Sequence, residues 1–138
     1  LHSLMSAPAW IGEHFYGVDS YGTFRGLRAS DSSRVWETDS VVPLTRWSTA
    51  FFVREGEESS RVWILNEVGE LILADLTPET FREIDRTQLI APTQEVKQRD
   101  YPIVWSHPAF AHRHIYARND EELIAVCVSA EGVNGKTD

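Results

Sequence analysis

The chain contains 138 residues, of which 42% are hydrophobic and 25% are charged, and its formal net charge is −8. This length suits about one globular domain, and the acidic balance disfavours a nucleic-acid-binding surface or one that attaches to anionic lipids, because both need clustered basic residues. No apolar run approaches the ~20 residues that a membrane-spanning helix requires. Residues 1–11 lack the pattern of a secretory leader, and the chain opens at Leu1 rather than Met, so we expect the natural start to lie upstream or to have been removed.

Three similar segments follow one another along the chain, and each opens on a serine followed by small and aromatic residues. They begin SAPAWI at Ser6, STAFFV at Ser48 and SHPAFA at Ser106, which gives spacings of 42 and 58 residues. Similarity in a fixed order at a period of about 40–50 residues is typical of β-propellers and solenoids. The sequence therefore predicts repeated structural modules of one kind.

The first copy, residues 1–39, contains four segments rich in aromatic and β-branched residues. We expect strands at residues 6–11, 15–19, 23–29 and 34–39. They are separated by the polar or glycine-containing stretches GEH, SYG and DSS, which are typical of tight turns. This pattern predicts four short antiparallel strands.

The second copy, residues 47–90, follows a linker at residues 40–46 and repeats the four-strand pattern. We expect its strands at residues 48–53, 61–66, 70–76 and 81–90. The last of these has a helical alternative, with Thr77 as N-cap, Pro78 in the first turn and apolar residues at near-helical spacing. Its place in the repeat, where residues 34–39 stand in the first copy, favours a strand.

The third copy, residues 105–132, follows a longer and polar linker at residues 91–104. We expect strands at residues 106–111, 114–118 and 122–129, and no fourth strand, because the tail at residues 133–138 is polar and contains glycine. The apolar runs at residues 71–76 and 123–128 indicate strands buried on both faces. Cys127 lies in the second run, so we expect a small buried side chain, and a single cysteine excludes an internal disulfide.

The stretch YGTFRGLRASDSSRVWE, residues 21–37, resembles the repeat of the pyrroloquinoline-quinone (PQQ)-like β-propellers, also called the quinoprotein alcohol dehydrogenase-like superfamily. Five positions match that repeat: Gly22, Phe24, Leu27, Ala29 and Trp36. Arg28 and Ser32 depart from it, since they replace its usual Asp and Gly. The resemblance covers residues 5–125 and implies an all-β fold of propeller blades, two of them complete with four antiparallel strands and the third partial. It also implies a periplasmic or secreted protein.

A cofactor is implied only by this resemblance. The dehydrogenases of the family bind PQQ with calcium and characteristically carry a pair of adjacent disulfide-bonded cysteines, whereas this chain has one cysteine. The sequence itself therefore supports no cofactor.

The predicted blades are too few to close a ring, because propellers have ~4–8 of them. Exposed apolar blade faces and an open strand edge attract another chain. We therefore expect either the remaining blades of a longer chain or copies that associate head to tail, since such contacts close into rings.

Few side chains suggest chemistry. Ser106 and His107 are weak candidates for a nucleophile and base, because adjacent strand residues point to opposite faces and no G-x-S-x-G turn is present. His112 and His114 are weak candidates for metal ligands, because they lie at a predicted turn with no third ligand nearby in sequence. We expect Ser6, Ser48 and Ser106 to be small inner-strand residues beside the propeller channel.

Two larger groups of residues also have structural explanations. A set of acidic residues in the turns after each second strand is a candidate rim for a cation or a basic partner, with solvated turns as the simpler interpretation. These residues are Asp19, Glu67, Glu70, Asp75, Asp120, Glu121 and Glu122. The five tryptophans, at positions 10, 36, 47, 63 and 105, recur at repeat positions and so indicate packing between blades rather than a sugar-binding platform.

Three functional hypotheses follow. The first is a binding or scaffold module with no visible catalytic motif. The second is a fragment of a quinone-dependent oxidoreductase whose ligands lie upstream, and the third is an esterase-like hydrolase with a site at an oligomer channel.

Overall fold

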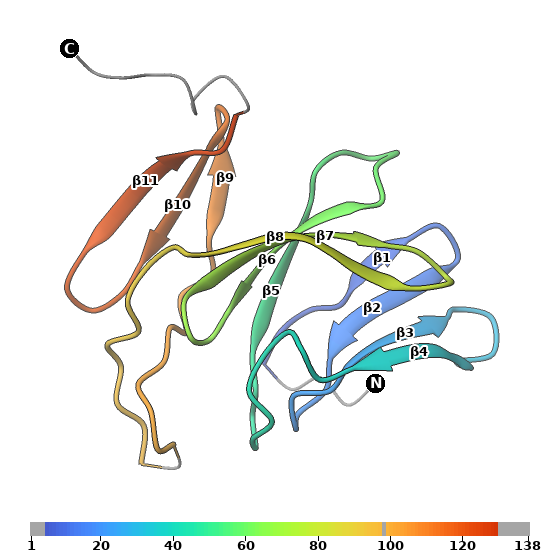
Figure 1. Cartoon of the computed structure of the whole chain (residues 1–138), viewed down its shortest axis with the longest axis horizontal. Coiled ribbons are helices and arrows are strands. Elements are labelled where there is room, and N and C mark those ends of the chain that lie inside the picture. Colours follow the sequence, from blue (N-terminus) through green and yellow to red (C-terminus); the bar gives the residue numbers. More distant parts are fainter. Residues whose placement is uncertain (1–4, 98, 130–138) are drawn as a thin grey trace.

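The fold is all-β, as the sequence predicts, and consists of three antiparallel sheets in chain order. The computed structural model describes residues 5–97 and 99–129. Two sheets have four strands, in the orders β1-β2-β3-β4 and β5-β6-β7-β8, and the third has three, in the order β11-β10-β9. Figure 1 shows them side by side, with the second sheet between the other two. We call these sheets blades 1, 2 and 3. No helix in the described part of the chain is long and apolar enough to cross a membrane.

Each strand overlaps a segment that the sequence marks by β-branched and aromatic residues, although β2 begins one residue before its predicted segment and β5 ends one residue after its own. Blade 1 contains β1 (Ala9–Ile11), β2 (His14–Val18), β3 (Phe24–Arg28) and β4 (Arg34–Thr38). Blade 2 contains β5 (Ala50–Arg54), β6 (Arg61–Asn66), β7 (Glu70–Leu76) and β8 (Phe81–Gln88). Blade 3 contains β9 (Ala109–Ala111), β10 (His114–Arg118) and β11 (Leu123–Cys127).

The helical alternative for residues 81–90 is wrong, because Phe81–Gln88 pair antiparallel with β7. Thr77 closes a turn instead of capping a helix: its hydroxyl accepts from the amides of Glu79 and Thr80, both at 3.3 Å. Pro78 then occupies the turn, where its fixed φ is favourable. The β7–β8 ladder has a bulge after Leu73, and the β3–β4 ladder has one after Gly26.

The hydrophobic core lies between the blades. Tyr16, Val18 and Phe24 of blade 1 pack against Ile64 and Ile72 of blade 2, and all five are at most 1% exposed. Burying a side chain the size of Phe or Ile contributes about 1.5–3 kcal/mol, so this interface is a principal source of stability. A second, smaller cluster joins blades 2 and 3 through residues that include Leu65, Ile90, Val104 and Ala117.

The two apolar runs differ in burial, although the sequence predicts that both are buried on both faces. All residues of strand β7 are buried or half-buried, as expected of a strand between two neighbours. In β11 every residue except Ile124 is exposed, because neither a fourth strand nor a fourth blade covers it within the described residues. Cys127 is therefore exposed, and the expectation of a buried thiol is wrong.

Candidate interaction surfaces

The turn between the second and third strands of each blade is closed by one Asp or Asn side chain. The Oδ1 atom of Asp19 accepts from the amides of Tyr21 and Thr23, at 2.8 and 3.1 Å. Asn66 accepts from two amides in the same way in blade 2, at 3.2 and 2.9 Å, and Asn119 does so in blade 3, at 2.8 Å each. These three residues occupy equivalent positions, so the residues before and after them can be aligned from blade to blade.

The asparagines also hold the linkers that lead into their blades. Asn66 donates from Nδ2 to the carbonyl oxygen of Val41 at 2.8 Å, and Asn119 donates to that of Ala91 at 2.9 Å. A carboxylate at this place has no N–H to donate, and Asp19 instead accepts from the guanidinium of Arg25. We call the two asparagine contacts linker latches.

Equivalent positions show which surface of blade 3 is uncovered. Phe24 pairs with Val18, Leu71 with Leu65 and Leu123 with Arg118, each just after the turn closed by the Asp or Asn residue. Phe24 and Leu71 are 0% and 5% exposed, because the following blade covers them, whereas Leu123 is 71% exposed. Leu123 thus occupies a position that is buried wherever another blade follows.

The same face of blade 3 carries further small or aromatic side chains. Residues that pair directly across an antiparallel ladder share a face. Tyr116 pairs with Ala109 and Ala125, and His114 pairs with Cys127, so these side chains lie on the face that Leu123 marks. The outer edge of β11 pairs with no strand in the described residues. We call this face and edge the open face of blade 3.

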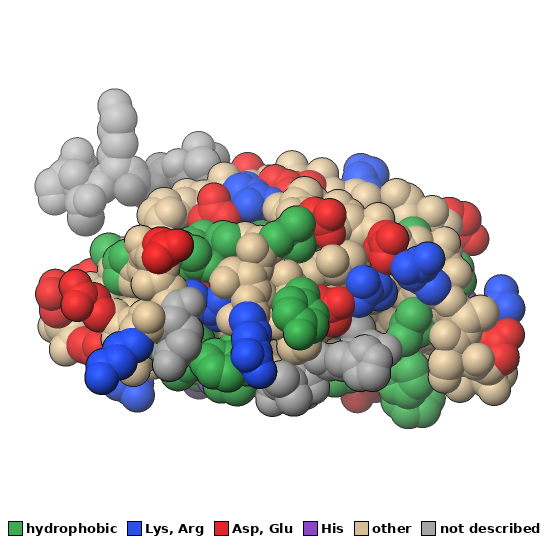
Figure 2. Space-filling model, turned by 90° about the horizontal axis from the view of Figure 1, so that it is seen from below, with side chains coloured by type: hydrophobic (Ala, Val, Ile, Leu, Met, Phe, Trp, Pro, Cys, Tyr) green, Lys and Arg blue, Asp and Glu red, His purple; other side chains and the backbone are tan. Residues whose placement is uncertain are grey.

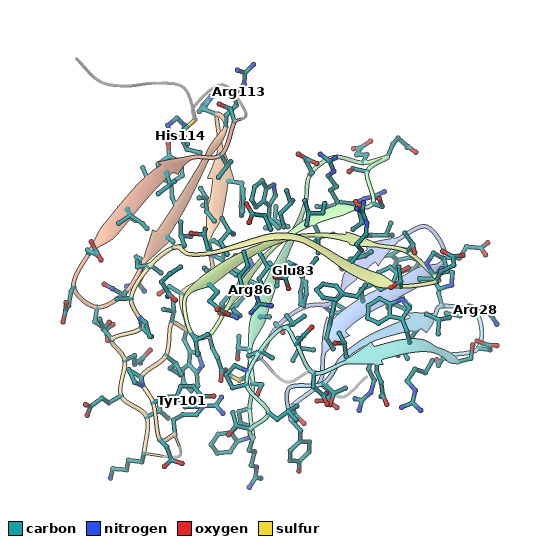
Figure 3. All side chains as sticks on the ribbon, viewed as in Figure 1. Arg28, Glu83, Arg86, Tyr101, Arg113 and His114 are labelled. Carbon is teal, nitrogen blue, oxygen red and sulfur yellow. The ribbon has the colours of Figure 1, made fainter. Side chains whose placement is uncertain are left out.

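A buried charged centre lies beneath the start of β5. The carboxylate of Glu67, 0% exposed, accepts from the Tyr101 hydroxyl at 2.7 Å, from Arg99 at 3.0 Å and from the amide of Thr49 at 2.8 Å. Burial raises the pKa of Glu67, while these donors oppose the rise. Burial and the nearby Glu67 charge also raise the pKa of Tyr101, which therefore remains a hydrogen-bond donor at neutral pH. The centre fixes the second linker, seen with Tyr101 at the lower left of Figure 3.

The three serines predicted to line the channel have different surroundings. Ser48 is buried and donates to the carbonyl oxygens of Pro43 and Thr45, at 2.9 and 2.8 Å. Ser6 and Ser106 are half-buried, and each lies three positions before the strand residue that pairs with Tyr16 or Tyr116. Ser48 lies five positions before the corresponding residue, Val53. Their role beside a channel stays a prediction.

Of the histidine candidates, His112 and His114 lie together at one turn, where Nδ1 of His114 is 2.9 Å from the carbonyl oxygen of His112. His107 packs its ring 4.7 Å from that of Phe51, and its Nδ1 lies 2.9 Å from the carbonyl oxygen of Pro108; no hydrogen bond among the described residues joins it to Ser106. His112 and Arg113 form the β9–β10 turn with φ angles of 49° and 62°. Figure 3 shows Arg113 and His114 at the tip of that hairpin. No group of three metal-ligating side chains occurs in the described residues.

The acidic residues do not form one continuous rim, because four of them pair with arginines. Asp19 pairs with Arg25, Glu67 with Arg99, Glu70 with Arg86 and Asp75 with Arg82. Asp120, Glu121 and Glu122 are exposed in the last turn. Figure 2 shows acidic, basic and apolar side chains interspersed over the face that it presents.

The tryptophans are likewise dispersed. Trp36 of blade 1 lies 6.4 Å from Phe81 of blade 2, and Trp63 of blade 2 lies 6.3 Å from Phe110 of blade 3, so these two pack between blades. Trp10 is 62% exposed on blade 1, where it meets Phe15 edge to face.

Sequence reasoning missed the linker latches and the buried Glu67 centre. A local signal exists for the turns but not for the latches: the stretches DSYG and NEVG place the turn-closing residues Asp19 and Asn66 three positions before a glycine. Both glycines, Gly22 and Gly69, adopt positive φ, at 100° and 80°. No local pattern indicates the pairing of Glu67 with Arg99, which lies 32 residues away.

Comparison with known proteins identifies the architecture only through solved structures. No protein-family model matches the chain, and no curated protein matches it. The structure of BamB from Moraxella catarrhalis is similar with a TM-score of 0.64 and 16% identity, over 88% of this chain and 36% of that one. The β-propeller domain of Myceliophteria thermophila Cps50 (Swd1) is similar with a TM-score of 0.58 and 12% identity, over 87% of this chain and 38% of that one. The chain thus spans little more than a third of either structure, and the likeness shows that its sheets are β-propeller blades.

Proposed function

We propose that this chain is a segment of a PQQ-like β-propeller that acts as a binding or scaffold module, and that the open face of blade 3 is where the next module attaches. The observation that carries this proposal is the exposure of Leu123, at 71%, where the equivalent Phe24 and Leu71 are 0% and 5% exposed. Both internal blade interfaces bury this position, so the surface around Leu123 is suited to the same kind of contact.

The attached module is a further blade of a longer chain or, for the 138-residue chain by itself, a second copy. Attachment buries apolar side chains on the face, and a strand of the attached module that pairs with β11 would give it the kind of neighbour that β3 and β7 have within their own blades in β4 and β8. Covering a leucine contributes about 1.5–3 kcal/mol, and the neighbouring alanines and Tyr116 add to it. Association through such a contact depends on protein concentration, and replacing one of its apolar residues by a charged residue should weaken it.

Light scattering coupled to size-exclusion chromatography tests the proposal over a concentration series. We expect the wild-type chain to form a discrete oligomer and Leu123→Asp to shift the distribution to monomer. Ile84→Asp is the matched control, because Ile84 is also exposed, at 40%, but lies on β8 of blade 2. A monodisperse wild-type monomer at every concentration, or equal effects of the two variants, would contradict self-association through this face.

A further inference from the structure

A groove of about 390 Å³ lies between blades 1 and 2, at the edge opposite the linkers. One wall is the β1–β2 hairpin, residues 11–14, together with Tyr16. The other wall comes from blade 2 and consists of Ser60 and residues 76–78. Because the groove lies between blades 1 and 2, the open face of blade 3 contributes nothing to it.

The lining is mainly apolar and is held in place by contacts between the blades. Ile11 and Pro78 supply accessible aliphatic surface, and Leu76 and Tyr16, each 1% exposed, lie beneath it. Trp36 stacks on Tyr16 and donates from its indole nitrogen to the carbonyl oxygen of Thr77 at 2.8 Å, so it connects the two walls. A preformed apolar groove of this kind accepts a side chain with little ordering cost.

The groove also has titratable side chains in its lining: besides Tyr16 these are Glu13 and His14, and the ring of His14 lies 6.2 Å from that of Tyr16. Glu13 lines it, and Glu79 follows Pro78 in the turn at its other wall. Both residues are exposed, and neither takes part in the ion pairs of the described residues. Burial and, secondarily, the charge of Glu79 raise the pKa of Tyr16 to about 12, so its hydroxyl stays protonated. Apolar walls flanked by two unpaired carboxylates favour a ligand that is apolar at its centre and positive beside it.

We propose that this groove binds an extended segment of a protein partner, which inserts one aliphatic side chain between blades 1 and 2 and places a lysine or arginine beside Glu13 and Glu79. The proposal deepens the binding function proposed above and rests on it. The partner's apolar side chain supplies the affinity, and the two carboxylates select the charge of the flanking residues. The chain's net charge of −8 adds a longer-range attraction for such a segment.

The probe is a fluorescently labelled peptide, acetyl-Gly-Lys-Leu-Lys-Gly-amide, compared with versions that carry Glu in place of Lys or Ser in place of Leu. Fluorescence polarisation with the 138-residue chain measures affinity, and the indole N–H resonance of Trp36 reports on the groove, because that group bonds to Thr77 of the wall. We expect the Lys-Leu-Lys peptide to bind more tightly than both others and to move the Trp36 resonance.

Variants of the chain locate the site. Glu79→Lys should weaken binding about three- to tenfold, the effect of losing and reversing an exposed charge contact. Pro78→Asn should remove it by placing a neutral polar group in the wall. Glu121→Lys makes the same charge change in the last turn of blade 3. Apart from the effect of the altered net charge, which both variants share, it should change the affinity for the peptide less than twofold.

Three results would overturn the proposal: equal binding of the Lys and Glu peptides, equal effects of Glu79→Lys and Glu121→Lys, or no binding of any peptide at millimolar concentration. Failure here differs from failure of the proposed function, because self-association through the open face of blade 3 is measured separately with Leu123→Asp. If the chain oligomerises but does not bind the peptides, the proposed scaffold function stands and the proposed role of the groove is wrong.

Discussion

Replacing Asn66 by aspartate tests whether the linker latches hold the blades in place. The substitution Asn66→Asp preserves the size and the Oδ1 acceptor that closes the turn, so it creates no cavity. It removes the Nδ2 donor from the carbonyl oxygen of Val41 and from the carboxylate of Glu70, both 2.8 Å away. The variant therefore removes the latch hydrogen bond and keeps the hydrogen bonds that close the turn.

The expected magnitude follows from what is left behind. The backbone carbonyl of Val41, in a residue that is 0% exposed, loses its asparagine partner, which costs about 1–3 kcal/mol. The new carboxylate also faces that of Glu70, although Arg86 still pairs with Glu70 at 2.7 Å. We expect a total loss of about 2–4 kcal/mol in the free energy of unfolding, a range that reflects the usual spread for an unsatisfied buried group.

Urea unfolding followed by tryptophan fluorescence and circular dichroism measures this loss as a shift in midpoint at constant slope. Asn119→Asp is the matched control, because it removes one latch bond, to the carbonyl oxygen of the exposed residue Ala91, and Asn119 has no carboxylate partner among the described residues. That variant should lose about 1 kcal/mol. Acidification should partly restore Asn66→Asp, since a protonated carboxyl can donate again. A change below about 0.5 kcal/mol in Asn66→Asp, or no difference between the two variants, would refute the reasoning.

Two further predictions concern other positions of the turns. Gly69→Ala should destabilise the chain by more than about 2 kcal/mol, because φ is 80° and the new Cβ would lie 2.0 Å from the carbonyl oxygen of Ile90; thermal unfolding that matches the wild type would contradict this. Asp19→Asn should reduce the loss of stability that the wild type shows on acidification. Burial raises the pKa of Asp19, but hydrogen bonds from backbone amides and from Arg25 lower it by more, so the net pKa lies below the ordinary value. The ionised form then stabilises the fold above that ordinary value, and this stability is lost as pH falls through the lowered pKa, which unfolding midpoints measured between pH 6 and pH 2 would reveal.

The four-strand modules were predictable, because each strand has a dense local pattern of β-branched and aromatic residues between turn residues. The helix-like spacing at residues 81–90 misleads only when that stretch is considered alone, and its position in the repeat favours a strand, which the structure has as β8. Alignment of the repeats from their opening serines is less secure for two reasons. The loop between β5 and β6 is longer than its counterparts, and Ser48 lies five positions before Val53, whereas Ser6 and Ser106 lie three positions before the corresponding residues.

Burial of the last strand was not predictable, because it depends on what lies next to β11 rather than on its own residues. The apolar run that includes Leu123 and Cys127 has the composition of a covered strand, yet both residues are exposed in the described chain. The latch from Asn66 to Val41 and the ion pair from Arg99 to Glu67 join residues 25 and 32 positions apart, so no local periodicity indicates them.

The linker latches have a consequence for how such a chain can lengthen during evolution. Each latch joins an asparagine of one blade to a carbonyl of the linker that enters that same blade, Val41 for Asn66 and Ala91 for Asn119. Donor and acceptor are therefore inherited together whenever a stretch of DNA encoding one linker and its following sheet is duplicated. A newly duplicated blade therefore contains both partners of its latch hydrogen bond and needs no compensating mutation in its neighbours.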